Sequence, residues 1–243
     1  MAWHQYQGMM VQKLNELTAG TEFYDAQVKS IVLRTARDPQ YASLFNHASM
    51  AYNNQQFFTT LSTKPKRIET QPGLKESLET TFGSIDTLRT TFLDTAAAMF
   101  GPGFVWLIWA RDLKDSGRNG SWRILPTYLA GTPFPEAGYR QQGVDMNTQN
   151  AASADSYYNS QPVNTVGAFG GWSQSGQATA KLPPGGTSVL PVLCVNTWQH
   201  VWLRDYGVSG KRRFLADWWE AIDWYQVHAA APTEAKTSVK FFS

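Results

Sequence analysis

Cysteine is almost absent from this sequence, and long apolar runs are missing altogether. The single cysteine, Cys194, excludes a disulfide within the chain, so a reducing compartment is the default expectation. No apolar run approaches the roughly 20 residues that span a bilayer, so we expect no membrane contact of that kind. The opening residues, MAWHQYQG, are neither basic nor followed by an apolar segment, so we expect no secretory leader, and no Arg-rich transit peptide is recognisable.

Charged side chains are also scarce, at 16% of 243 residues, whereas apolar residues reach 42%. This balance favours a large buried core and argues against wholesale disorder. Aromatic residues make up 14% of the chain and include ten tryptophans, which provide rigid surfaces for a core or for partners. The formal charge of +2 is compatible with RNA contact without requiring it.

The first part of the chain predicts two amphipathic helices. Residues 3–19 place Met10 and Leu14 on one face. A second helix is predicted over 39–60, and the modest connection between the two is typical of a helical hairpin. We therefore assign residues 1–70 to an N-terminal helical hairpin.

The second part, residues 71–243, mixes helical and strand patterns. Apolar residues at steps of three and four predict helices, and short β-branched and aromatic runs predict strands. Together they predict an α+β protein, in which a three-stranded antiparallel sheet is flanked by helices. The expected elements are helices over 74–100 and 211–228, strands over 104–110, 122–130 and 189–195, and a short helix that carries His200 and is capped by Asn196 or Thr197.

A long insertion, residues 132–188, separates the second and third expected strands. It contains five charged residues and is rich in Gly, Ser, Asn, Gln and Thr, so its composition only weakly favours any defined secondary structure. It is too long for an ordinary loop of a compact domain. Two explanations remain open, a disordered loop or a segment that is ordered by wrapping over a partner.

The segment VNTWQHVWLRDYG, residues 195–207, has the form of a metal site without its ligands. His200 lies on a short aromatic-rich helix, directly after an apolar strand. Amides, Asn196 and Gln199, occupy positions where a metal enzyme would carry carboxylates. The segment therefore raises the question of whether an active site is present or has been lost.

Several blocks, in the same order, resemble the iron/manganese superoxide dismutases nearly end to end outside the insertion. The block LNELTAGTEF is similar to the end of that family's first helix, and FNHASMAYNN is similar to its second. FGSIDTLRTTFLDTAAAMFGPGFVWLIW is similar to the long helix and first strand, and PVLCVNTWQHVWLRDYG and FLADWWEAIDWYQV are similar to the metal-binding segment and the terminal helix. The resemblance implies the dismutase-like fold for the whole chain.

Carried over residue by residue, the resemblance implies a dismantled metal site. The family holds one redox metal with three histidines and one aspartate, and the corresponding positions here are Ala2, Asn54, His200 and Asn196. Neutral amides are poor ligands for iron or manganese, and alanine offers none. We therefore expect no metal, no other cofactor and no enzymatic activity, with His200 as a buried, hydrogen-bonded histidine of the core. The alternative is an active dismutase with altered ligands.

The resemblance extends to the non-catalytic, dismutase-like proteins in the small subunit of fungal mitochondrial ribosomes. It implies a structural role in mitochondrial translation, a location in the mitochondrial matrix, and contacts with other small-subunit proteins and with rRNA, but no small-molecule substrate. Enzymes of the family dimerise through the face around the metal, so we expect pairing with a second dismutase-like ribosomal protein. A non-ribosomal dismutase-like binding protein is the other alternative. The residues predicted to contact partners are Gln199, Trp202, Asn54, Lys211, Arg212 and Arg213.

Overall fold

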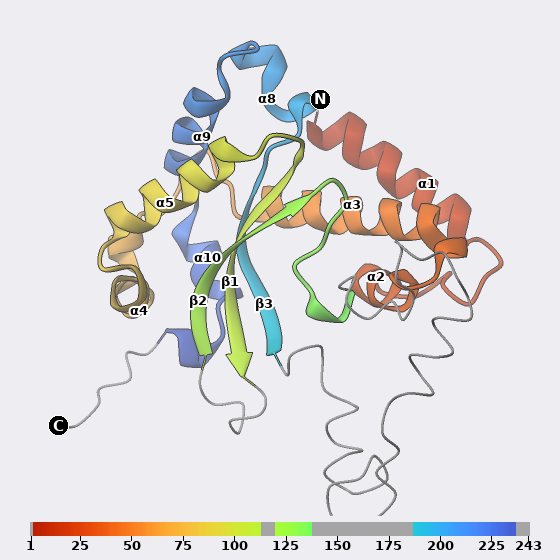
Figure 1. Ribbon diagram of the computed structural model, residues 1–243, viewed down its shortest axis with the longest axis horizontal. Coiled ribbons are helices and arrows are strands. Elements are labelled where there is room, and N and C mark those ends of the chain that lie inside the picture. Colours follow the sequence, from red (N-terminus) through yellow and green to blue (C-terminus); the bar gives the residue numbers. More distant parts are fainter. Residues whose placement is uncertain (1, 113–119, 138–186, 237–243) are drawn as a thin grey trace, which may run out of the picture.

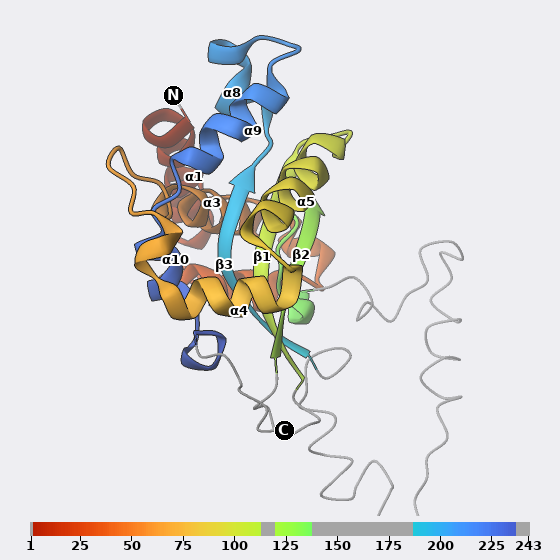
Figure 2. The same ribbon diagram turned by 90° about the vertical axis from the view of Figure 1, so that its left-hand side faces the viewer.

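The computed structural model describes residues 2–112, 120–137 and 187–236. Helices lie on both sides of a central sheet, with α1, α2 and α3 to the right and α4, α5 and α9 to the left in Figure 1. Figure 2 shows the same arrangement after a quarter turn, with α4 crossing near one end of the strands and α8 beyond the other. The insertion, except for residues 132–137 and 187–188, lies outside the described residues, so both explanations of it stay open.

The N-terminal helical hairpin is present. A π-helical turn, Ala2–Gln7, leads directly into α1, Gly8–Thr18, which packs along α3, Ala42–Thr59. Met10, Leu14 and Ala48 are buried between them, as the apolar periodicity predicts. A further helix, α2 (Val28–Thr35), was not predicted, because its eight residues are too few for a clear periodic signal.

The sheet has the predicted antiparallel form. Strands β1 (Gly103–Asp112), β2 (Gly120–Tyr128) and β3 (Thr187–Asn196) pair in the order β2-β1-β3. The central strand is buried on both faces, which explains its continuous apolar run. Cys194 is fully buried in β3, and burial raises the pKa of its thiol, so it is a small residue of the core.

The helix predicted over 74–100 is two helices in the structure. α4 (Pro72–Phe82) ends at Gly83, whose φ of 84° is accessible chiefly to glycine. α5 (Ile85–Ala98) then begins at Ser84, whose hydroxyl accepts a hydrogen bond from Thr87 N at 3.0 Å. The apolar periodicity continues across the break because both helices bury one face against the sheet.

The helix predicted over 211–228 is also interrupted. α9 (Lys211–Glu220) and α10 (Trp224–Ala230) are separated where Ile222 forms a bridge with Leu61. The Asp223 carboxylate accepts a hydrogen bond from Tyr225 N and so caps α10. Tertiary pairing with the linker between hairpin and sheet therefore overrides the helical pattern at this point.

The short helix that carries His200, α8 (Gln199–Tyr206), begins after Trp198, which has no side-chain cap. The prediction that Asn196 or Thr197 caps it is wrong. The Thr197 hydroxyl donates to Gly103 O, and Asn196 Oδ1 accepts from Trp198 N, ahead of the helical residues. No helix among the described residues is long and apolar enough to cross a membrane.

A candidate functional site at the ligand positions

Three segments that are distant in the sequence converge at the positions that the sequence singled out. Gln7 comes from the π-helical turn, Asn54 from the centre of α3 and Asn196 from the last residue of β3. Asn54 and Asn196 are fully buried. Buried amides are costly unless their donors and acceptors are satisfied, so their partners determine what the site can do.

The three side chains form a continuous chain of hydrogen bonds, here called the amide chain (Gln7, Asn54 and Asn196). Gln7 Nε2 donates to Ala51 O at 3.0 Å, and Asn54 Nδ2 donates to Gln7 Oε1 at 2.9 Å. Asn196 Nδ2 donates to Asn54 Oδ1 at 3.2 Å, and Asn196 Oδ1 accepts from Trp198 N at 2.9 Å. Every amide in the series thus donates to the preceding member and accepts from the next.

The two ends of the amide chain determine its direction. Ala51 offers a carbonyl, which can only accept, and Trp198 offers a backbone N–H, which can only donate. Reversing any one amide would place two oxygens or two NH₂ groups against each other. The orientation of all three amides is therefore set by backbone groups, and the oxygens that could face a cation are already engaged.

The residues of the amide chain are unsuited to bind the iron or manganese ion that the family holds at these positions. Neutral amide oxygens are weak ligands for such ions, and those of the amide chain already accept hydrogen bonds. Within 2–112, 120–137 and 187–236, no group of three or more His, Cys, Asp or Glu residues is placed to hold a metal. Ala2 begins the π-helical turn, and its side chain lies outside the description.

His200 forms no hydrogen bond with the amide chain in the described part of the structure. Its ring stacks on Tyr6 with centroids 4.0 Å apart and also contacts Trp198. Burial lowers the pKa of the imidazole, so the neutral form is favoured. Its Nε2 atom is buried without a hydrogen bond to any described residue, so the expected hydrogen-bonded histidine is instead a half-buried, stacked one.

Sequence reasoning missed Tyr6 and Gln7. Both lie in the turn that precedes α1, where five-residue helical spacing presents them toward α3 and α8. The sequence contains only a weak signal, which is the amide Gln7 three positions before the buried Met10. This signal does not identify Asn54 as the partner of Gln7, because the two residues are 47 positions apart in the sequence.

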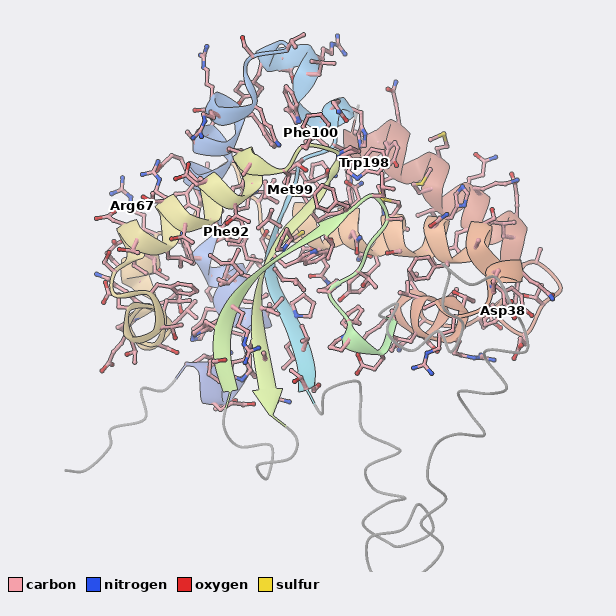
Figure 3. The ribbon with its side chains drawn as sticks, in the orientation of Figure 1. Asp38, Arg67, Phe92, Met99, Phe100 and Trp198 are labelled. Atoms are coloured by element: carbon pink, nitrogen blue, oxygen red, sulfur yellow. The ribbon has the colours of Figure 1, made fainter. Side chains whose placement is uncertain are left out.

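An apolar surface surrounds the start of α8, and we call Phe100, Leu203 and Val208 with Gln199 the α8 surface. Phe100 is fully exposed at the turn between α5 and β1, and Val208 is nearly so. Figure 3 labels Phe100 and its neighbour Met99 at this turn. The α8 surface surrounds a cleft of about 480 Å³ whose wall includes Trp202.

The predicted contact residues near this surface differ in accessibility. Gln199 is exposed, whereas Trp202 is buried and its indole N–H donates to Thr197 O at 3.1 Å. Asn54 has no exposed surface and belongs to the amide chain. Gln199 and its apolar neighbours are therefore the residues of this surface that a partner can contact directly.

The basic cluster at the start of α9 is largely occupied within the chain. Lys211 Nζ donates to Met99 O at 2.8 Å and to Ala97 O at 3.4 Å, which satisfies carbonyls at the end of α5. Arg212 pairs with Asp94 at 3.0 Å. Arg213 is exposed and forms no ion pair within the described part of the chain, so it is the member that remains available to phosphate.

Comparisons with known proteins agree with this geometry. Residues 70–121 and 173–230 match the model of the C-terminal domain of iron/manganese superoxide dismutases. Small ribosomal subunit protein mS43 of Schizosaccharomyces pombe is 26% identical over 231 residues, covering 92% of this chain and 74% of that protein. Small ribosomal subunit protein mS42 of the same organism is 25% identical over 203 residues, covering 82% and 70%. An iron superoxide dismutase of Babesia bovis is 22% identical over 214 residues, covering 88% and 75%.

Proposed function

Because residues 70–121 and 173–230 belong to the C-terminal domain family of the iron/manganese superoxide dismutases, we propose that the chain is a structural, non-catalytic member of that family. Its role is that of a scaffold component of the small subunit of the mitochondrial ribosome, in the matrix. The matches to the two small-subunit proteins cover larger shares of this chain and of the matched protein than the matches to many of the dismutases do. The scaffold acts through protein contacts and rRNA contacts.

The amide chain is the observation that carries this proposal. At a dismutase centre, a carboxylate and imidazoles must leave lone pairs free for the ion. Here the side chains at two of the corresponding positions, Asn54 and Asn196, bond to each other, to Gln7 and to a backbone group, and each amide oxygen already accepts a hydrogen bond. The site therefore contributes to folding, and the fold is retained for its surface.

Metal analysis distinguishes this proposal from an active dismutase with altered ligands. We expect protein purified from iron- and manganese-supplemented cultures to carry less than about 0.1 equivalent of either metal, since one imidazole cannot retain the ion. Atomic absorption provides the measurement, and a superoxide assay on the same sample provides the second. Stoichiometric metal together with enzymatic turnover would show that the chain is a dismutase.

Sedimentation tests the ribosomal assignment. We expect the tagged protein, in a gradient of mitochondrial lysate, to migrate with the small ribosomal subunit and to move with the intact ribosome when magnesium is high. The control is a tagged matrix enzyme of similar size, which should stay at the top. A chain found only at the top of the gradient would instead support a non-ribosomal dismutase-like binding protein.

We further propose that the α8 surface pairs with a second dismutase-like ribosomal protein. A fully exposed phenylalanine beside exposed leucine and valine is costly in water and is typical of protein interfaces. The surface surrounds α8, which follows the amide chain directly, and this is the face through which the resemblance implies dimerisation. Loss of charge at Gln199 suits a partner that offers neutral hydrogen-bonding groups.

A further inference from the structure

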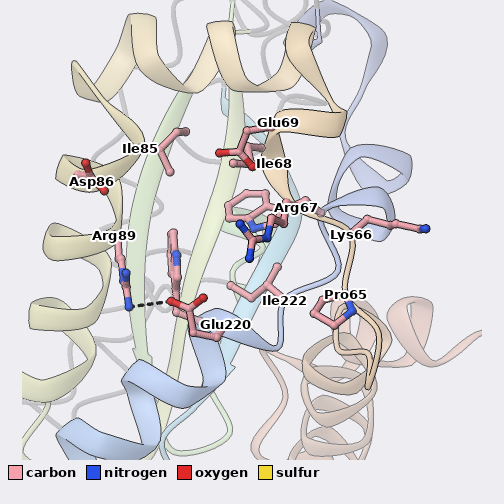
Figure 4. Close-up of a pocket in the computed structure, with 12 residues that line it drawn as sticks. Pro65, Lys66, Arg67, Ile68, Glu69, Ile85, Asp86, Arg89, Glu220 and Ile222 are labelled. Atoms are coloured by element: carbon pink, nitrogen blue, oxygen red, sulfur yellow. Dashed lines mark ion pairs between the residues drawn. The ribbon is translucent and has the colours of Figure 1, made fainter.

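A cleft at the other end of α9 from the α8 surface contains none of the ligand positions in its lining. Its volume is about 440 Å³, and it lies between the linker at 65–69, the first turns of α5 and the junction of α9 with α10. Figure 4 shows Arg67 and Arg89 entering it from opposite walls, with Ile222 at its base. The volume falls within the range that small-molecule sites occupy.

The linker wall of this cleft is held rigidly. Ser62 N donates to Ala221 O at 3.1 Å, Asp223 N donates to Thr60 O at 2.8 Å, and Trp224 N donates to Lys66 O at 3.0 Å. Lys66 N also donates to the Asp223 carboxylate at 3.2 Å. A wall fixed by backbone bonds keeps the cleft open without a ligand, so binding would carry little ordering cost.

The cleft has a mainly polar lining of exposed charged side chains around a small apolar floor, to which the half-buried Ile85 adds. Ile68, Ile222 and Trp219 form buried parts of the floor. Arg89 pairs with Glu220 at 2.9 Å, but the guanidinium of Arg67 forms no hydrogen bond or ion pair with the described residues. The carboxylate of Glu69, two positions along the linker, is likewise unpaired in the described chain.

We propose that this cleft binds a nucleotide, with its base on the apolar floor and its phosphate on Arg67. A guanidinium pairs with phosphate through two parallel hydrogen bonds, which a neighbouring carboxylate would otherwise occupy. The unpaired Glu69 can accept from an exocyclic amine of the base, as carboxylates do when they read cytosine or adenine edges. The ligand must therefore carry an anion, a flat apolar ring and an amine donor.

An acidic peptide fits this cleft less well. Its lining balances three acidic residues, Glu69, Asp86 and Glu220, against three basic ones, so net charge favours neither an acidic peptide nor RNA, and the choice between them falls to Arg67 and Glu69. An acidic side chain could pair with Arg67, but it would bring no donor for Glu69. The inference rests on the proposed function for the source of the nucleotide. It adds to that function the place where an unstacked rRNA base would be held.

Calorimetry on the isolated protein tests the inference with three ligands: AMP, adenosine, and the single-stranded hexamer r(A)6. We expect AMP and the hexamer to bind, and adenosine to bind at least about tenfold more weakly because it lacks the phosphate. The variant Arg67→Gln should weaken AMP by a similar factor. The matched control Arg204→Gln removes an exposed arginine on α8, outside the cleft, and should leave AMP binding unchanged.

The outcomes separate the possible sources. Equal affinity for AMP and r(A)6 identifies a free-nucleotide site, and much tighter binding of the hexamer identifies an RNA site. Absence of binding by both, unchanged AMP binding in Arg67→Gln, or preference for an acidic aromatic tripeptide would overturn the inference. Co-sedimentation with the small subunit is measured independently, so failure here leaves the proposed function standing.

Discussion

Asn196→Asp is expected to lower the free energy of unfolding at pH 7.5 by about 3 kcal/mol. One oxygen of the new carboxylate can still accept from Trp198 N, but the other would face Asn54 Oδ1, where the native amide donates at 3.2 Å. Turning Asn54 and Gln7 over would only move the clash to the carbonyl of Ala51. Urea unfolding followed by circular dichroism measures the loss.

The pH dependence of this variant identifies the cause. Burial and the opposing oxygen raise the folded-state pKa of the new carboxyl above its ordinary value of about 3.9, so the folded variant binds more protons than the unfolded one. The penalty is therefore complete above the raised pKa, and it shrinks as the pH falls toward about 4. A protonated carboxyl can donate to Asn54 Oδ1 as the amide does.

The control for this experiment is Asn15→Asp, the same chemical change on an exposed position of α1. We expect it to alter stability by no more than about 0.5 kcal/mol and to show no comparable pH dependence. Wild-type stability in Asn196→Asp at neutral pH would mean that the amide chain does not run in the direction described. It would also reopen the position to a metal-binding carboxylate.

Phe100→Asp is expected to weaken pairing with a second dismutase-like protein by about 30-fold or more. The ring is fully exposed in the isolated chain, so its burial against a partner would contribute much of the interface energy. A charge at this position would instead have to be desolvated when the partner docks. Light scattering after size exclusion, with the second dismutase-like protein of the same organism, measures the complex.

Folding is not expected to change in Phe100→Asp, because the side chain buries no surface within the described chain. Thermal unfolding should therefore match the wild type. Tyr225→Asp, an exposed aromatic on α10 away from the α8 surface, is the matched control and should pair normally. Unimpaired pairing by Phe100→Asp would place the interface elsewhere, and a stable complex of two identical chains would favour a non-ribosomal homodimer.

Much of the fold was predictable because its signals are local. The apolar run of β1 and the periodicity of α1 and α3 identify their elements without reference to the rest of the chain. The breaks at Gly83 and Ile222 were missed for a physical reason. Apolar spacing reports which face is buried, and two successive helices on the same sheet preserve that spacing across a turn.

The composition of the candidate site was predictable, whereas its connections were not. The resemblance implies that Asn54 and Asn196 stand where the family has a histidine and an aspartate, so it already indicates that the ligands have been lost. Gln7 joins these two amides only through packing of the π-helical turn on α3. Lys211 was predicted to contact a partner together with Arg212 and Arg213, but its ammonium group donates to the carbonyl of Met99 at the end of α5.

The sequence by itself determined most of the order of helices and strands and, through the resemblance, the absence of ionisable groups at three of the four ligand positions. Only the tertiary structure decided that Asn54 and Asn196, 142 positions apart, share a hydrogen bond, and in which direction that bond runs. The reason is that periodicity depends on near neighbours along the chain. The polarity of a buried amide depends on backbone donors and acceptors brought against it by distant segments.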